Sequence, residues 1–516
     1  KLYPHKSPGY NCNEMDSVRR QARELRNLQN YVDAQYGGPG KGWFRIVKDP
    51  FEARRVINAG KMAIIPAIEV SDLFDCGLRN GVSRCTTQDV DRRLNEVYND
   101  LGVRQMELIN KFDNGFGGVA GDSTTTGVIV NVGNFSETGR FWDMKPCKGP
   151  TEESDHEQYG VPALLAPLAN ALPPGALPVY GPGPHCNAMG LTTLGEHLVR
   201  RMMDKRMLID PDHLSVIARK QLLSLVESKN YSGILSSHSW STDDAYPRIY
   251  ELGGFVAPYA GGSKGFVRTW KKLKSERDKR YFWGIGWGAD MNGFGNQGPP
   301  RNEPNEVKYP FKSWDGKVTL DRQRTGVRTF DINKEGVAHY GLYPDWVEDL
   351  RMQAGDEIVD DLARASEAYL QMWERSVGVG SSHTCRQARL RFTGAGLGSV
   401  KIATRAEEVL RGAGQPRSRV NRVWRYCVGG KGGGRVSVVY TKAGTSGLIV
   451  STAPRHRVAG IGPGSRTSLR SRSAGKGRRY YFGVRGGKVR WVALASAGVA
   501  RNARELAREL KLAGVR

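Results

Sequence analysis

The sequence lacks any apolar run long enough to cross a membrane, and it lacks closely spaced cysteine pairs. A membrane-spanning helix needs about 20 consecutive apolar residues, and no stretch of the 516 residues approaches that length. None of the seven cysteines forms a Cys-x-x-Cys pair, which argues against a zinc ribbon and a thioredoxin-like redox motif. The composition, 39% hydrophobic and 25% charged, is globular, and the length predicts at least two domains.

Acidic residues are scarce in the last quarter of the chain. From Cys385 to Arg516 there are 29 lysines and arginines but only 4 aspartates and glutamates, which leaves 48 basic and 48 acidic residues of the totals of 77 and 52. The whole net charge of +25 therefore belongs to this last part. Because the composition changes so sharply there, we predict one domain over 1–380 and a second, basic domain over 385–516.

The cysteine spacing predicts three disulfides and leaves Cys12 alone. Disulfides would place the chain in an oxidising compartment, secreted or extracytoplasmic at the cell surface. The alternative is seven unrelated buried thiols. The predicted pairs are Cys76–Cys85, Cys147–Cys186 and Cys385–Cys427.

Short apolar strands alternate with amphipathic helices in the first domain, a pattern typical of parallel βα units. Polar side chains recur where these strands end. In a βα barrel the active site lies at that end of the strands, so these side chains are candidate site residues. The predicted strands are 62–69, 105–111, 207–212, 233–238, 254–259 and 282–290, and the strand-end residues are Glu69, Asn110, Lys111, His213, His238 and Asp290.

The fold class that this pattern predicts is α/β, a TIM-type (β/α)8 barrel. Six strands are two short of a closed barrel, and the sequence before Met62 reads as helix or turn. We therefore expect the first two strands to lie upstream of Lys1, in residues absent from this chain or cleaved away. An open, incomplete sheet is the alternative.

Four of the strand-end residues are suited to binding a metal. Imidazole nitrogens such as those of His213 and His238 are common ligands of zinc, and the carboxylate of Glu69 has two oxygens with which to bridge two cations. Asp290 can bind a metal and accept a proton from water that the metal activates. Simple structural roles are the alternative, with His213 as a helix cap and His238 as a hydrogen-bonded side chain.

Several motifs resemble, in order and spacing, the membrane (renal) dipeptidase family of the amidohydrolase superfamily, over residues 60–375. The motifs are Ile68-Glu69, Leu208-Ile-Asp-Pro-Asp-His213-Leu-Ser215, Ile234-Leu-Ser-Ser-His238-Ser239 and Gly284-Ile-Gly-Trp-Gly-Ala-Asp290. The resemblance implies a TIM barrel with two zinc ions, bridged by Glu69. It also implies that His213 and His238 bind the second ion and that Asp290 binds the first and shuttles the proton. Arg248, ten residues after His238, lies near the position of the family's arginine for the substrate carboxylate.

The sequence departs from the family pattern at two places. It contains no His-x-Asp pair, which the family uses on its first strand to bind the first metal. If that strand is truly absent, we expect one zinc ion or none rather than two. The family usually has a histidine where this chain has Asn110, so we assign Asn110 to substrate binding and expect a substrate other than a simple dipeptide.

The basic domain reads as a small β-rich unit with a terminal helix. We predict strands at 435–441, 447–452, 479–485 and 488–494, a helix at 502–512, and a mobile basic loop at 465–478. Aromatic residues interleave with arginine and lysine, which suits an anionic polymer or an acidic cell-surface glycan as partner. The alternative is that the aromatics are core and the arginines a solvated surface. The aromatics are Trp424, Tyr426, Tyr440, Tyr480, Tyr481, Phe482 and Trp491.

Two hypotheses from different classes follow. The first is a zinc-dependent, dipeptidase-like amidohydrolase that cleaves an amide bond of a small peptide or amide with metal-activated water, or a related barrel that acts on an ester or lactone. The second is a non-catalytic barrel that has lost its first metal site and serves as a secreted binding or structural surface protein. An oligomer is compatible with either.

Overall fold

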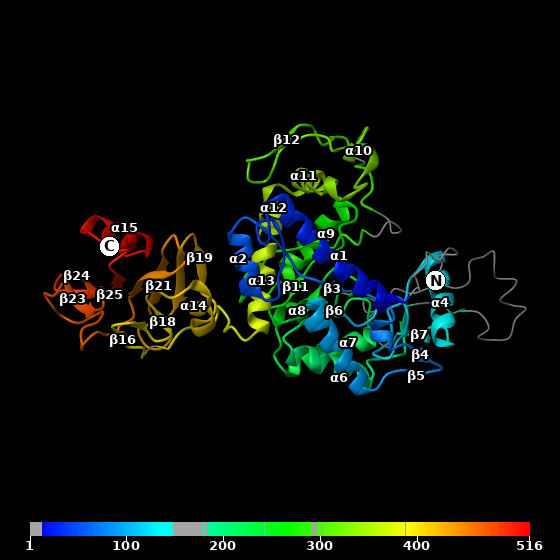
Figure 1. Ribbon diagram of the computed structural model, residues 1–516, viewed down its shortest axis with the longest axis horizontal. Coiled ribbons are helices and arrows are strands. Elements are labelled where there is room, and N and C mark those ends of the chain that lie inside the picture. Colours follow the sequence, from blue (N-terminus) through cyan, green and yellow to red (C-terminus); the bar gives the residue numbers. More distant parts are fainter. Residues whose placement is uncertain are drawn as a thin grey trace, which may run out of the picture. The chain divides into compact units, whose positions relative to one another are not determined.

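The computed structural model describes residues 13–147, 178, 180, 184–241, 243–291, 297–301, 303–387 and 389–515. The chain divides into two compact units, Lys1–Ser376 and Val377–Arg516 (Figure 1). Cys12 and most of the segment 148–183 lie outside the described residues. No helix in the described part of the chain combines the length and the apolar composition that a bilayer crossing requires.

The first unit is built on short parallel strands that follow one another in space in chain order. β1 (Phe44–Ile46) pairs with β2 (Met62–Ile64), and β6 (Gln105–Glu107) lies between β3 (Ala67–Ile68) and β9 (Leu208–Asp210). A bridge from Ile209 to Ile234 leads on to β10 (Leu235–Ser236), which pairs with β11 (Phe255–Val256). The carboxyl ends of these strands meet at one edge, as the βα pattern predicts.

The strand upstream of Met62 corrects one expectation. We expected only helix and turn there, but β1 forms between two helices and pairs in parallel with β2. At the other end, a single parallel bridge between Tyr259 and Gly288 is the described pairing of the expected strand 282–290. No pairing among the described residues joins that segment back to β1, so closure into an eight-stranded barrel stays a prediction.

Helices cover the parallel strands, and their first turns carry conventional caps. Asn13, Asp49 and Ser215 accept backbone N–H groups at the starts of α1, α2 and α7. The helices of this unit are α1 (Glu14–Gln35), α2 (Pro50–Asn58), α3 (Thr87–Asn95), continued as a π-helix over Glu96–Leu101, α4 (Thr124–Thr138), α6 (Thr193–Asp204), α7 (Val216–Ser228), α8 (Ala245–Glu251), α9 (Ser263–Glu276), α10 (Ile332–Glu335), α11 (Tyr343–Ala354), α12 (Asp356–Ala363) and α13 (Ala365–Ser376), with 3-10 turns at Leu73–Asp75 and Tyr340–Leu342. α13 packs on α2 and β11.

Four short pairs of antiparallel strands lie outside the parallel strands of this unit. The pairs are β4 (Leu78–Arg79) with β5 (Val82–Ser83), β7 (Met144–Pro146) with β8 (His185–Asn187), β12 (Phe311–Lys312) with β13 (Thr319–Leu320), and β14 (Arg324–Thr325) with β15 (Arg328–Thr329). β7, β8 and α4 lie in the segment 113–187, between the predicted strands 105–111 and 207–212.

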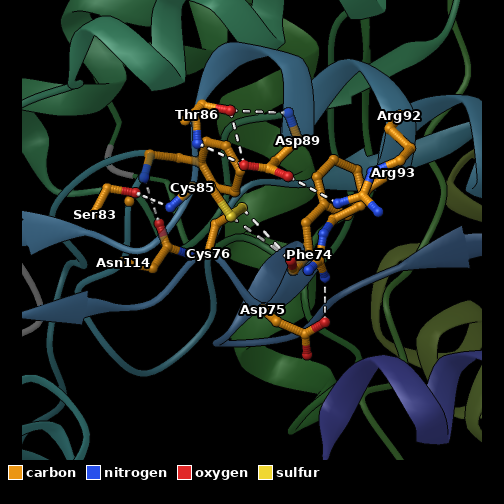
Figure 2. The surroundings of a disulfide bond; sticks show 12 residues. Phe74, Asp75, Cys76, Ser83, Cys85, Thr86, Asp89, Arg92, Arg93 and Asn114 are labelled. Carbon is orange, nitrogen blue, oxygen red and sulfur yellow. Dashed lines mark hydrogen bonds and ion pairs between the residues drawn. A yellow bond between two sulfur atoms is a disulfide. The ribbon is translucent and has the colours of Figure 1, made fainter.

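All three predicted disulfides are present. Cys76 bonds Cys85, Cys147 bonds Cys186, and Cys385 bonds Cys427. Figure 2 shows the first of them beside the capping residue Thr86, whose side chain accepts the Asp89 N–H at the start of α3. This disulfide therefore ties the β4–β5 hairpin to the helix that follows it.

The second unit is a seven-stranded antiparallel sheet with a helix near each end of its sequence. The strand order is β19-β20-β21-β22-β25-β24-β23. The strands are β19 (Ser418–Val420), β20 (Val423–Cys427), β21 (Arg435–Tyr440), β22 (Ser446–Ser451), β23 (Ser471–Gly475), β24 (Arg478–Arg485) and β25 (Lys488–Ser496). A small sheet of β16 (Phe392–Thr393), β17 (Gly396–Leu397) and β18 (Val400–Lys401) precedes α14 (Ala406–Ala413), and α15 (Ala503–Leu512) ends the unit.

One expectation for this unit was wrong, and one of two open alternatives is confirmed. The segment 465–478, expected to be a mobile loop, contains the edge strand β23, which pairs with β24. Most of the aromatic side chains are core rather than surface, and they pack into two separate hydrophobic clusters. The buried ones are Tyr426, Tyr440, Tyr480, Phe482 and Trp491.

Candidate metal centre

Three side chains from the ends of parallel strands converge on one point. The Nε2 atoms of His213 and His238 lie 2.9 Å apart, and His213 Nε2 lies 3.1 Å from Oε1 of Glu69. His238 Nε2 is 3.9 Å from the same oxygen. Both imidazoles are buried, whereas about a third of the Glu69 side chain is exposed, so the cluster opens to solvent on the Glu69 side.

The backbone places the two imidazoles. His213 follows β9 with a positive φ of 65°, a conformation that costs free energy for a residue other than glycine and turns the chain sharply. Its carbonyl accepts the N–H of Ala120 at 2.7 Å. His238 follows β10, and its N–H donates to Oδ2 of Asp212 at 3.0 Å. Local strain and a buried carboxylate thus hold the two rings against each other, with centroids 4.8 Å apart and planes tilted by 48°.

Asp212 supports His238 from behind. Its carboxylate is fully buried and accepts hydrogen bonds from the hydroxyls of Ser236 and Ser241, each at 2.8 Å. Oδ2 also lies 3.5 Å from Nδ1 of His238, and the Ser237 hydroxyl lies 3.0 Å from the same nitrogen. A carboxylate behind the non-ligating nitrogen is the usual way in which a metal-binding histidine is oriented.

An aromatic and a lysine cover His213. The rings of His213 and Trp240 stack with centroids 4.8 Å apart, and the Lys111 ammonium lies 4.0 Å from the centre of the Trp240 ring. Lys111 also pairs with Asp122 at 3.0 Å. This layer of Trp240 and Lys111 fixes the tilt of the His213 ring and excludes water from one of its faces.

Asn110 belongs to the cluster. Its Nδ2 donates to Oε1 of Glu69 at 2.8 Å. Its Oδ1 is buried and has no hydrogen-bond partner in the described structure. The atom that Asn110 offers to a ligand is therefore an acceptor.

Asp290 and Arg248 are not among the three convergent residues. Asp290, with a positive φ of 41°, follows the segment in which Gly288 packs against His238. It is not one of the group whose ligand atoms all lie within 4.8 Å of one another, which is Glu69, His213 and His238. Arg248 is on α8, where its guanidinium binds the Glu227 carboxylate of α7 at 2.6 Å. The structure therefore leaves Arg248 engaged in a helix-to-helix ion pair outside the cluster.

Two buried carboxylates beneath the cluster were missed by the sequence reasoning. Glu107, the last residue of β6, is 3% exposed, and Asp210, the last of β9, is fully buried. Burial raises the pKa of both well above their usual values, and the neighbouring carboxylates add to the effect. An acidic residue inside a short apolar run was the available signal.

The donor set suits a divalent cation. Zinc is held by imidazole nitrogens at about 2.0–2.1 Å and carboxylate oxygens at about 2.0–2.2 Å, which places neighbouring ligand atoms about 3.4 Å apart in a tetrahedron. The three distances of 2.9, 3.1 and 3.9 Å bracket that value. Four carboxylates at or beside this point pair with no lysine or arginine in the described structure, although a buried negative charge needs a counter-charge. They are those of Glu69, Glu107, Asp210 and Asp212. A cation between the two imidazoles would supply that counter-charge.

A large cavity lies elsewhere in the first unit. Its volume is about 1260 Å³, and Trp287, Phe311, Trp314 and Tyr343 are among the side chains that line it. None of the three convergent residues lines this cavity. We therefore place the candidate site by its chemistry and not by the size of the cavity.

Comparisons with known proteins give structural matches only. No protein-family model matches the chain, and no curated protein matches it significantly. Among solved structures, an amidohydrolase from Pseudomonas aeruginosa matches at 13% identity and a TM-score of 0.37, covering 70% of this chain and 84% of that one. A probable dipeptidase from Pseudomonas aeruginosa matches at 14% identity and a TM-score of 0.36, covering 72% and 82%.

A third match is a metallopeptidase from Rhodobacter sphaeroides that was solved with a phosphinate mimic of the dipeptide L-Ala-D-Ala. It matches at 13% identity and a TM-score of 0.34, covering 64% of this chain and 68% of that one. The three matched proteins are thus described as an amidohydrolase, a probable dipeptidase and a metallopeptidase. At these identities and TM-scores they do not by themselves assign an activity to this chain.

Proposed function

We propose that the first unit is a metal-dependent hydrolase that cleaves an amide bond in a small peptide or related amide. The observation that carries the proposal is the convergence of His213 Nε2, His238 Nε2 and Glu69 Oε1 above a set of buried carboxylates that lack a lysine or arginine partner. These three residues would hold the ion, zinc being the ion that the donor set suits best, and a second ion would need Asp290 as well.

The chemistry needs an electrophile, a nucleophile and a proton carrier. A bound divalent ion polarises a carbonyl and lowers the pKa of water toward neutrality. Asn110 Oδ1 is placed to accept an N–H of the substrate, which orients the amide. The Asp290 carboxylate takes the proton of the attacking water and passes it to the leaving nitrogen. Trp240 and Lys111 exclude bulk water from the face of His213 that they cover.

The disulfides support a location outside the cytoplasm. Because disulfides form and persist mainly under oxidising conditions, we propose that the protein acts there, secreted or at the cell surface. A substrate for such an enzyme would be an extracellular peptide or a cell-envelope amide rather than a cytosolic metabolite.

The test measures metal and hydrolysis together. Protein purified without added metal is analysed for zinc, and a panel of dipeptides, N-acyl amino acids and esters is assayed before and after chelation and again after zinc is restored. We expect at least one zinc per chain and hydrolysis that chelation abolishes and zinc restores. His238→Ala should lower zinc content and activity at least tenfold, because it removes one of three visible ligands.

His197→Ala is the matched control, since His197 pairs with Asp91 on the outside of the unit and should change neither quantity. Zinc content near zero in the wild-type protein, or hydrolysis that resists chelation, would refute the proposal. The better description of the barrel would then be the non-catalytic surface protein.

We propose further that the second unit binds an anionic polymer through charge. Nine lysines and arginines and no acidic residue lie between Arg466 and Arg490, and none of the nine pairs with a carboxylate in the described structure. Since most aromatics of the unit are buried, stacking contributes little to this proposal, which rests on electrostatics alone. A charged edge strand also discourages sheet-to-sheet aggregation, which is the simpler explanation of the same residues.

A further inference from the structure

We infer that Glu107 supplies a further oxygen ligand to the cation held by Glu69, His213 and His238, so that the centre has two histidines and two carboxylates. This inference rests on the proposed metal centre. It concerns a residue that lies outside the motifs named in the sequence analysis. It makes the last residue of β6 part of the binding site rather than part of the core.

The two oxygens of Glu107 have different surroundings. Oε1 accepts a hydrogen bond from the Ser237 hydroxyl at 3.2 Å. Oε2 is fully buried, has no hydrogen-bond partner in the described structure, and lies 3.9 Å from Nε2 of His213. Leaving a buried carboxylate oxygen without a partner costs about 1–3 kcal/mol or more, so a structure that keeps one usually reserves it for a ligand.

Oε2 of Glu107 lies near Nε2 of His213, the nitrogen that would bind the cation. Ligand atoms around an ion at about 2.1 Å are separated by about 3.0 to 4.2 Å, depending on the coordination geometry. The 3.9 Å between Glu107 Oε2 and His213 Nε2 falls within that range. Glu107 is not one of the group whose ligand atoms all lie within 4.8 Å of one another. Its side chain would therefore make a small movement toward the ion when the ion binds.

Charge supports the same assignment. A lysine or arginine side chain could neutralise Glu107, but in the described structure Glu107 pairs with neither. The basic side chains beside it are His213 and His238. Asp210, Asp212 and Glu69 surround it with further negative charge. A divalent ion that Glu107 contacts directly neutralises this group most effectively, because the attraction between charges falls with distance.

The availability of the Glu107 oxygen is a further reason for the assignment. Glu107 is the buried carboxylate beside the histidines with an oxygen that no other described group uses. With it, the visible ligands number four, and the water used in hydrolysis would be a fifth, a number that zinc at catalytic sites also reaches.

The test compares the metal affinity of the full-length wild-type protein with that of Glu107→Gln, with zinc and cobalt(II) titrated by calorimetry and by the visible spectrum of cobalt. Glutamine keeps the shape of the side chain and its bond to Ser237 but removes the charge. We expect a loss of affinity of tenfold or more and a changed cobalt spectrum, which reports the ligand set directly. Glu107→Asp keeps the charge but withdraws the oxygen, and it should lose affinity as well.

Asp345→Asn is the matched control. Asp345 is also a fully buried carboxylate with one oxygen bonded, by Tyr309, and with the other lacking a partner in the described structure. It lies on α11, outside the cluster, and the variant should bind both metals as tightly as the wild type does.

The outcomes separate the two proposals. A wild-type protein that binds metal, with Glu107→Gln binding it equally well, overturns the role of Glu107 and leaves the metal centre intact. Weaker binding with an unchanged cobalt spectrum also overturns it, because Glu107 would then act through its charge alone. If Glu107→Gln does not fold, undiminished affinity in Glu107→Asp overturns it. A wild-type protein that binds neither metal refutes the metal centre itself.

Discussion

Asp113 is a buried carboxylate whose charge is costly to the fold. Burial raises the pKa of Asp113 from 3.8 to about 6, although its Oδ1 accepts bonds from Val119 and Asn187, each at 2.9 Å. The folded state therefore holds this proton more tightly than the unfolded state does. The stability it contributes is fully present below about pH 4 and is lost as the pH rises through about 6.

The variant Asp113→Asn removes this pH dependence. Asparagine keeps an oxygen to accept both bonds and carries no charge, so near pH 7.5 the variant should be more stable than the wild type by about 3 kcal/mol. Near pH 4 the difference should vanish. Urea unfolding at both pH values measures it. The exposed Asp321→Asn should show neither effect, and an Asp113→Asn variant less stable than the wild type at pH 7.5 would contradict the argument.

At the residue scale, the sequence predicted the polar residues that contrast with the apolar strands before them. Glu69, His213 and His238 were found because each lies within a few residues of the end of an apolar run. Glu107 was missed because it lies within such a run, where only burial and an unsatisfied oxygen distinguish it. Arg248 was assigned by spacing alone, and spacing does not specify which face of a helix a side chain occupies.

At the element scale, backbone hydrogen bonds of Gly288 hold the segment that carries Asp290. The Gly288 N–H donates to the Pro258 carbonyl, and the Gly288 carbonyl accepts the Ala260 N–H, both at 2.8 Å. A Cβ at Gly288 would overlap the Cβ of His238 and the carbonyl oxygen of Ser237. Only glycine permits this approach, which places Asp290 at the same end of the sheet as the two histidines.

The variant Gly288→Ala should therefore separate the segment from His238. Overpacking of this kind costs about 1–3 kcal/mol, and the displaced backbone should also weaken metal binding and hydrolysis. Gly265→Ala in α9 is the control, since its nearest side-chain atom is 3.9 Å away and alanine favours a helix by about 1 kcal/mol. Unfolding and zinc titration measure both variants. A Gly288→Ala protein with wild-type zinc affinity would show that this contact does not position the site.

Longer elements were predicted from the sequence and shorter ones were not. The strands of β21, β22, β24 and β25 were expected within one or two residues, because alternation over six or more residues is a clear signal. β1 has only three residues between a turn and a helix, too few for any period to appear. β23 reads as a loop from its serine, glycine and arginine content, and it becomes a strand because β24 offers it an edge to pair with.

At the scale of the whole molecule, charge is unevenly divided between a neutral unit and a basic one. Exposed arginines and lysines of the 466–490 segment lie on and around β23, β24 and β25 without acidic partners in the described structure. Because such side chains are surrounded by counterions that a polyanion displaces, binding should depend steeply on salt. With about four of these residues engaged, affinity should fall about 100-fold between 50 and 200 mM salt.

The matching experiment uses fluorescently labelled heparin and the full chain. A variant with four glutamines should bind heparin at least tenfold more weakly and with a shallower salt dependence, since fewer counterions are released. A control with the same loss of charge elsewhere in the unit should bind nearly as the wild type does. The first variant is Arg472→Gln, Arg479→Gln, Arg485→Gln and Lys488→Gln, and the control is Lys431→Gln, Lys442→Gln, Arg455→Gln and Arg501→Gln. Equal losses in the two would mean that net charge alone attracts heparin and that the 466–490 segment is not a defined binding surface, whereas no binding by the wild type would leave edge protection as the role of these residues.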